Sequence, residues 1–174
     1  MTNHRTFRAG PLRAVAALAA ALAIVAASLA AAPPASAASY GPHCQHDPYF
    51  IEYNACLRLD DLGAFLWNAH VGIDAYMTEQ YAREIIACGA NFRAELWGDD
   101  GGYPYDDFIS YLPLKSGFPV AGPWGLGAEL QKTVHSSQLN EDSGQDELYA
   151  YVSYYDCHTL RTHRKRTGTI RGYF

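Results

Sequence analysis

The sequence predicts a mainly β fold: an antiparallel β-sandwich with one short helix, stabilised by two disulfides. Three observations predict it. Segments in which apolar and polar residues alternate recur along the chain, and this period of two is typical of half-buried strands. Stretches rich in glycine, proline and aspartate separate these segments, as turns require. The chain has 174 residues and four cysteines, which is enough for one domain with its own core.

The N-terminal segment has the features of an export signal. Arginines precede an alanine-rich apolar run over residues 14–32, and two prolines and then Ala35-Ser36-Ala37 follow it. Small residues in this pattern are typical of signal-peptidase cleavage. We therefore predict a signal peptide over residues 1–37 and a single secreted β-sandwich domain over residues 38–174. The alternative is an uncleaved membrane anchor, because the apolar run is long enough to span a bilayer.

Strands are expected where the alternation is clear. Val71, Ile73 and Ala75 fall on one face of such a segment, and polar or larger residues fall on the other. In chain order, strands are expected at residues 49–59, 70–77, 91–97, 108–114, 148–157 and 167–174.

Three segments are expected to be irregular. Residues 38–48 are polar, residues 115–128 are rich in glycine and proline, and residues 136–146 are polar and acidic. None of them shows a strand pattern that outweighs these turn-forming residues.

One helix is expected over residues 78–88. Thr78 can cap its N terminus and Gly89 follows its last residue. Tyr81 and Ile85 are spaced four apart, so they lie on the same helix face.

The four cysteines are expected to form two disulfides, because exported thiols oxidise and their number is even. Three connectivities are possible. We favour Cys44–Cys56, which closes a short loop, and Cys88–Cys157, which ties the C-terminal segment to the rest of the domain. The alternative is metal binding near Cys44, which has a histidine on either side within two residues, but the paired cysteines of a structural zinc site are absent.

An acidic loop is expected over residues 99–107, where four aspartates fall within nine residues: Asp99, Asp100, Asp106 and Asp107. Carboxylates this close repel one another unless water screens them or a cation binds them. Ca²⁺ prefers several carboxylate and carbonyl oxygens in flexible geometry. The loop therefore predicts a Ca²⁺ site, and the alternative is a solvated acidic turn.

Two short motifs around this loop suggest a family. The strand expected at Phe92–Trp97 is followed by Asp99 and, after a spacer, by Asp107 and an apolar pair; upstream, the segment His46–Tyr49 leads into another expected strand. Over residues 46–114 the chain resembles the C-two type domain, the calcium- and phospholipid-binding β-sandwich of synaptotagmins and protein kinase C. The resemblance implies Ca²⁺ ligands at Asp47, Asp99 and Asp107, assisted by Asp100 or Asp106.

Charge is unevenly distributed. Residues 38–156 contain five basic and 18 acidic residues, whereas residues 157–174 contain five basic residues and no acidic one. The basic segment is expected either to pair with the acidic body or to bind an anionic surface or polymer. An export signal argues against a nucleic-acid partner. The residues expected to bind an anion are Arg161, Arg164, Lys165 and Arg166.

Tyrosines are concentrated between residues 148 and 157. Tyr149, Tyr151 and Tyr155 fall on the strand face opposite Ala150 and Val152. We favour a row of tyrosines inside the sandwich core; the alternative is an exposed platform on which sugars or a protein partner stack.

The sequence favours binding over catalysis. It contains no G-x-S-x-G elbow, no H-E-x-x-H motif and no phosphate-binding loop. We predict a secreted, non-catalytic binding module with an extracellular partner, which is not an integral membrane protein once the signal is removed. The alternatives are a small extracellular hydrolase whose site the spacing does not identify, and a secreted protease inhibitor with Gly117–Gly127 as its reactive segment.

Overall fold

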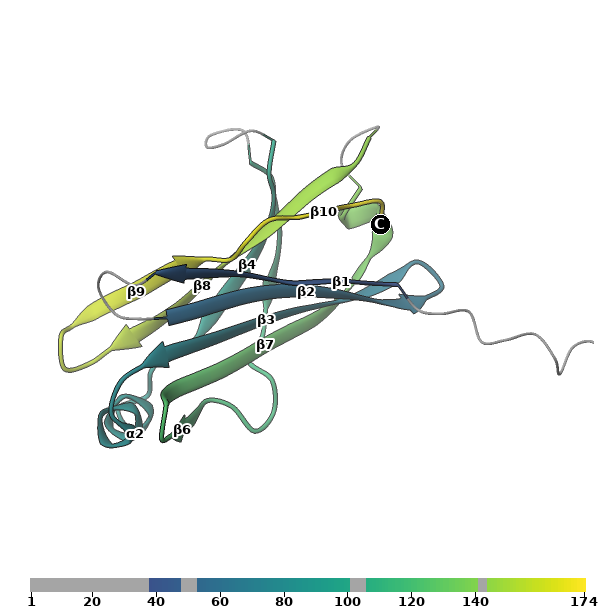
Figure 1. Ribbon diagram of the computed structural model, residues 1–174. Helices are drawn as coiled ribbons and strands as arrows, with labels where there is room; N and C mark the ends of the chain where they lie inside the picture. The colour runs from purple at the N-terminus through teal and green to yellow at the C-terminus, as the bar shows by residue number, and fades with distance from the viewer. Residues whose placement is uncertain (1–37, 48–52, 101–105, 141–143) are drawn as a thin grey trace, which may run out of the picture. The chain divides into compact units, whose positions relative to one another are not determined.

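The computed structural model describes residues 38–47, 53–100, 106–140 and 144–174. The predicted signal peptide therefore lies outside the described residues. The described chain forms two antiparallel sheets (Figure 1). Sheet A has the strand order β1-β2-β3-β7-β6, and sheet B has the order β10-β8-β4-β5. In sheet B, β9 and β10 pair with opposite ends of the same edge of β8. The predicted mainly β fold is confirmed.

The strands vary widely in length. Those of sheet A are β1 (Ser39–Asp47), β2 (Tyr53–Gly63), β3 (Leu66–Tyr76), β6 (Val120–Gly122) and β7 (Gly125–His135). Those of sheet B are β4 (Arg93–Gly98), β5 (Phe108–Leu112), β8 (Asp146–Asp156), β9 (Arg161–Arg166) and β10 (Ile170–Gly172).

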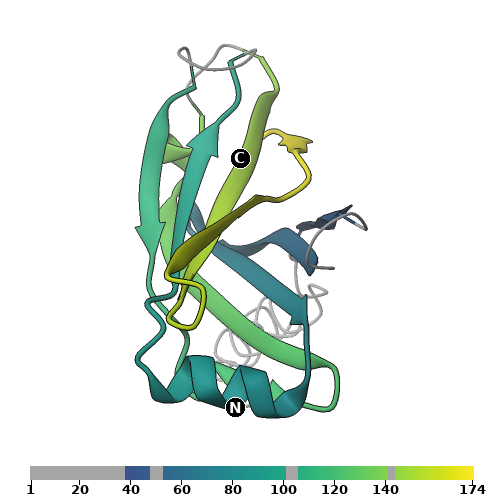
Figure 2. The same ribbon diagram turned by 90° about the vertical axis from the view of Figure 1, so that its left-hand side faces the viewer.

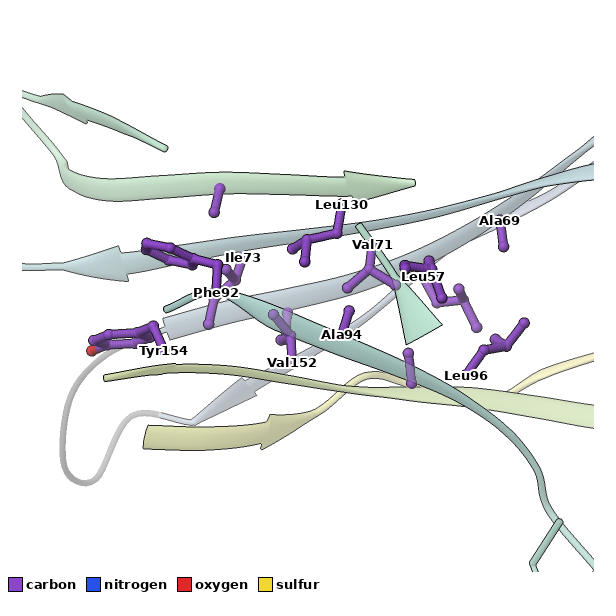
Figure 3. Packing of buried hydrophobic residues seen from close by; sticks show 14 of the residues in the cluster. Leu57, Ala69, Val71, Ile73, Phe92, Ala94, Leu96, Leu130, Val152 and Tyr154 are labelled. Atoms are coloured by element: carbon purple, nitrogen blue, oxygen red, sulfur yellow. The ribbon is translucent and has the colours of Figure 1, made fainter. Parts of the chain in front are cut away.

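The core lies between the two sheets (Figure 3). Leu57, Val71 and Leu130 project into it from sheet A, and Leu96 and Val152 project from sheet B; all five are fully buried. The predicted alternation in β3 is confirmed, since Val71 and its inward neighbours are buried. Each buried leucine or valine stabilises the fold by about 1.5–3 kcal/mol relative to an exposed one.

The helix α2 (Glu79–Ala87) lies across one end of the two sheets (Figure 2). The Thr78 side chain caps it by accepting a hydrogen bond from the Tyr81 backbone N–H at 3.2 Å. Ile85 is buried, and the Tyr81 hydroxyl donates to Asp156 of β8 at 2.9 Å. The predicted helix is confirmed. In the described part of the chain, no helix is long and apolar enough to cross a membrane.

Both favoured disulfides are present. Cys44–Cys56 joins the paired strands β1 and β2, and Cys88–Cys157 joins the end of α2 to the end of β8. The second disulfide closes a long loop, so it constrains the unfolded chain more than the first.

Two segments expected to be irregular contain strands, although residues 115–119 and the turn at 123–124 are irregular as expected. Residues 38–48 contain β1, a polar strand that forms the edge of sheet A and therefore needs little apolar surface. Residues 115–128 contain β6 and the start of β7. Position 125, at the start of β7, requires glycine because its φ is +121° and a Cβ there would lie 2.3 Å from the Ala75 carbonyl oxygen. Gly125 and Gly127 therefore permit close strand contact, whereas Gly117, with a φ of +89°, lies in the turn that precedes β6.

The C-terminal third also differs from expectation. The basic segment forms β9, which pairs with β8 although both of its faces are polar. The strand expected at residues 167–174 is only the three-residue β10. In the segment expected to be a loop, Ser136–Gln138 forms a 3₁₀ turn and β8 begins at Asp146.

Candidate functional site

The face of sheet B that points away from the core carries aromatic and charged side chains. Ala94 and Leu96 of β4 point inward, so Glu95 and Trp97 point outward. The register places Glu95 beside Tyr151 of β8 and Tyr111 of β5. We call this surface the outer face. Its residues are Arg93, Glu95, Trp97, Phe108, Tyr111, Tyr149, Tyr151, Ser153, Tyr155, Thr162, Arg164 and Arg166.

Three arginines on the outer face stack on tyrosine rings. The guanidinium carbon lies 4.0 Å from the ring centroid for Arg93 on Tyr111, and 3.6 Å for Arg164 on Tyr151. Arg166 lies over Tyr149 at 3.8 Å. Each contact is worth about 0.5–1 kcal/mol at an exposed site. The rings therefore hold the guanidinium groups in fixed orientations.

The carboxylates on this face do not match the arginines one to one. Glu95 Oε1 lies 3.3 Å from Arg93 Nε, and Glu95 Oε2 lies 2.8 Å from Arg164 Nη2. Arg166 instead has its own carboxylate, Asp99, at 2.6 Å. Two cations thus share Glu95, and this pair of arginines carries one positive charge that no described ion pair balances.

A polar hollow of about 350 Å³ lies beside Arg93. Asn91, Ser153, Tyr155 and Thr162 form the rest of its lining. The Arg93 side chain is half exposed, and Tyr155 is 37% exposed. The hollow therefore combines a cation, hydroxyl groups and an aromatic ring held on paired strands with the amide of Asn91, which precedes β4.

The ends of the predicted acidic loop are bound to the outer face. Asp99 pairs with Arg166 and lies 3.4 Å from the Thr169 hydroxyl. The Tyr149 hydroxyl donates to Asp106 at 2.7 Å. Burial, followed by this hydrogen bond to a carboxylate, raises the pKa of the Tyr149 phenol. The acidic loop and the basic segment, which were each predicted from the sequence to bind a ligand, therefore contact each other.

The other predicted Ca²⁺ ligands lie at the ends of the loop or outside the described side chains. Asp100 and Asp107 are exposed at the two ends of the loop, and the Asp107 carbonyl accepts from the Gly98 N–H at 2.9 Å. Asp47 ends β1, and its side chain lies outside the described residues, as do residues 101–105. Among the described residues, no three His, Cys, Asp or Glu side chains form a group that could hold a metal ion. The Ca²⁺ site stays a prediction.

Strand alternation divides the four residues predicted to bind an anion. Arg164 and Arg166 lie on the outer face. Lys165 points the other way, with its ammonium 4.1 Å from the ring centroid of Tyr53 in sheet A. Arg161 is exposed at the start of β9. Arg93 joins the outward pair from β4, and the alternation in residues 91–97, which places Phe92 and Ala94 inside, could have identified it.

The prediction that the row of tyrosines lies inside the sandwich core is wrong. The row lies on the outer face, because the strand alternation of β8 turns Ala150 and Val152 inward. Tyr149 is 2% exposed because Arg166 and Asp106 cover it. Tyr151 lies beneath Arg164. Tyr155 is the exposed member and lines the hollow.

A scan against protein-family models, a search of curated proteins and a search of solved structures each found no match to this chain.

Proposed function

We propose that this chain is an exported, non-catalytic module that binds acidic groups of an extracellular polymer at the outer face. The observation that carries the proposal is the sharing of Glu95 by Arg93 and Arg164 at the edge of a polar hollow. An anion in the hollow would balance the extra positive charge.

The chemistry of the hollow suits carboxylate or sulfate. Arg93 uses Nε toward Glu95, and a guanidinium in that orientation presents terminal N–H groups that match the oxygens of an oxyanion. Asn91 and Thr162 supply further donors, whereas the Ser153 hydroxyl donates to the Arg93 carbonyl at 3.4 Å. Because the Tyr111 ring already orients Arg93, binding costs less side-chain entropy than it would at a free arginine.

The proposal is tested by calorimetric titration of the protein with alginate and dextran sulfate, using uncharged dextran as the control polymer. We expect the acidic polymers to bind, with an affinity that falls as salt rises. Arg93→Gln should weaken binding about tenfold, since it removes a charge-assisted hydrogen bond.

Arg171→Gln is the matched control. Arg171 of β10 forms an ion pair with Glu147 of β8 at 2.7 Å. This variant therefore removes one positive charge, as Arg93→Gln does, but at a position outside the hollow. Equal loss in both variants would mean that only net charge matters. Binding of dextran as tight as that of dextran sulfate would refute an anion site.

A further inference from the structure

A second concave site lies on sheet A, where the end of β3 meets the β6–β7 hairpin. It is a groove of about 500 Å³. Asp74 and Tyr76 of β3 line one side, and Val120 and Trp124 line the hairpin side. None of the residues predicted from the sequence to bind a metal or an anion lies in it. Its size is in the range of small-molecule sites.

The hairpin holds a tryptophan out in solvent beside this groove. Residues 123 and 124 form the two-residue turn between β6 and β7, and Trp124 is 81% exposed. Tyr76 is 40% exposed and Val120 is 44% exposed. A large exposed apolar surface next to a cavity is a common property of binding sites. Gly125 fixes the turn against β3, because only glycine tolerates its close contact with the Ala75 carbonyl.

A glycine keeps the floor of the groove open. Gly127 pairs with Asp74 across β3 and β7. A Cβ at Gly127 would lie 3.3 Å from Val120 Cγ2 and 3.5 Å from Asp74 Oδ1. Any larger residue would therefore fill the space between the carboxylate and the hairpin.

Asp74 is the acidic group of the groove. No described donor forms a hydrogen bond or ion pair with its carboxylate, whereas the neighbouring Glu129 is bound by Lys115 at 2.6 Å and His70 at 3.2 Å. Partial burial, and then the charge of Glu129, raise the pKa of Asp74. The Asp74 oxygens can thus accept hydrogen bonds from a molecule placed in the groove.

We infer that this groove binds a neutral glycan by stacking a sugar ring on Trp124 and Tyr76 and by accepting sugar hydroxyl hydrogen bonds at Asp74. A sugar ring presents an apolar C–H face and hydroxyl donors at its rim, which together match two aromatic rings flanking one carboxylate. The glycan site is independent of the proposed anion site, because it lies on the other sheet and its ligand has no charge.

The test is a titration of the full oxidised chain with neutral hexasaccharides of glucose, N-acetylglucosamine, xylose and mannose. Tryptophan fluorescence reports binding, because Trp124 is 81% exposed, whereas Trp67 is buried and Trp97 is only partly exposed on the other sheet. We expect at least one hexasaccharide to give a saturable change. Trp124→Ala removes the reporter, so its binding is measured by calorimetry and should be about tenfold weaker through loss of stacking. Asp74→Asn should weaken binding without removing the fluorophore.

Tyr173→Ala is the matched control, because Tyr173 is 67% exposed and lies outside the groove. Arg93→Gln should leave hexasaccharide binding unchanged, so failure of one site is distinguished from failure of the other. Choline is titrated as the alternative ligand, because aromatic rings beside a carboxylate can also bind a quaternary ammonium cation. The inference is overturned if none of the four hexasaccharides binds, if binding survives Trp124→Ala unchanged, or if choline binds and the sugars do not.

Discussion

Asp156 holds α2 and the end of β8 together, and replacing it should destabilise the domain in a pH-dependent way. The residue is 2% exposed. Its carboxylate accepts from the Tyr81 hydroxyl at 2.9 Å and from the backbone N–H groups of His158 at 2.9 Å and Thr159 at 3.3 Å. Burial alone would raise the pKa of Asp156, but hydrogen bonds from the Thr159 side chain and backbone, the Tyr81 hydroxyl and the His158 backbone outweigh it and lower the pKa from 3.8 to about 2.

The size of the effect follows from the difference between the pKa of Asp156 in the unfolded chain, 3.8, and its pKa in the folded chain, about 2. One pKa unit corresponds to about 1.4 kcal/mol, so ionisation of Asp156 stabilises the fold by about 2 kcal/mol. The folded pKa is the lower one; the stabilisation is therefore fully present above the unfolded pKa of 3.8 and is lost as the pH falls toward 2.

Asp156→Asn should therefore lower the free energy of unfolding by about 2 kcal/mol at pH 7, or the Tm by about 8 °C. The gap between variant and wild type should close as the pH falls, because a protonated aspartic acid resembles asparagine. Urea unfolding followed by circular dichroism, with both disulfides intact, measures this at several pH values. Asp107→Asn, at an exposed position, is the control and should change little. A gap that stays constant down to pH 2, or no gap at pH 7, would refute the reasoning.

Three further predictions concern the disulfide, the acidic loop and export. Replacing Cys88 and Cys157 together by serine should destabilise the domain by about 4 kcal/mol in urea unfolding, because their disulfide spans 69 residues; a loss below 1 kcal/mol would contradict this. Adding 10 mM Ca²⁺ after EDTA should raise the free energy of unfolding by about 1.5–3 kcal/mol and the Tm by several degrees. Asp99→Asn should abolish this rise. An unchanged wild-type Tm would remove the Ca²⁺ prediction and leave Arg166 as the counter-ion of Asp99. Protein recovered from the medium of an expressing culture should begin at Ala38 by mass spectrometry; an intact N terminus there would contradict cleavage.

Local sequence patterns predicted the strands and the helix that show apolar alternation or capping residues within their own segments. The alternation around Val71 and Ile73 marks a strand that buries one face, and Thr78 with Gly89 delimits a helix. β9 gives no such pattern, because its stability comes from ring stacking and ion pairs with other strands. β7 was missed for a different reason: Gly125 and Gly127 suggest a loop, although they allow close contact with β3 and an open groove.

The candidate sites depend on pairings that no local pattern reveals. Asp99 and Arg166 are 67 residues apart in the chain, yet they form an ion pair. The uneven charge predicts pairing of the basic segment with the acidic body as one of two outcomes, and the two segments do pair here, but no local pattern could indicate which residues pair. The excess charge at Arg93 arises because the register of β4, β8 and β9 brings two arginines to Glu95.

The central claim, an anion site at the outer face, is tested most directly by nuclear magnetic resonance of the ¹⁵N-labelled protein during addition of a sulfated oligosaccharide. We expect saturable shifts concentrated at the residues that line the hollow and the loss of these shifts in Arg93→Gln; the lining residues are Asn91, Arg93, Ser153, Tyr155 and Thr162. Shifts concentrated at other residues, or a uniform response that both Arg93→Gln and Arg171→Gln reduce equally, would contradict it.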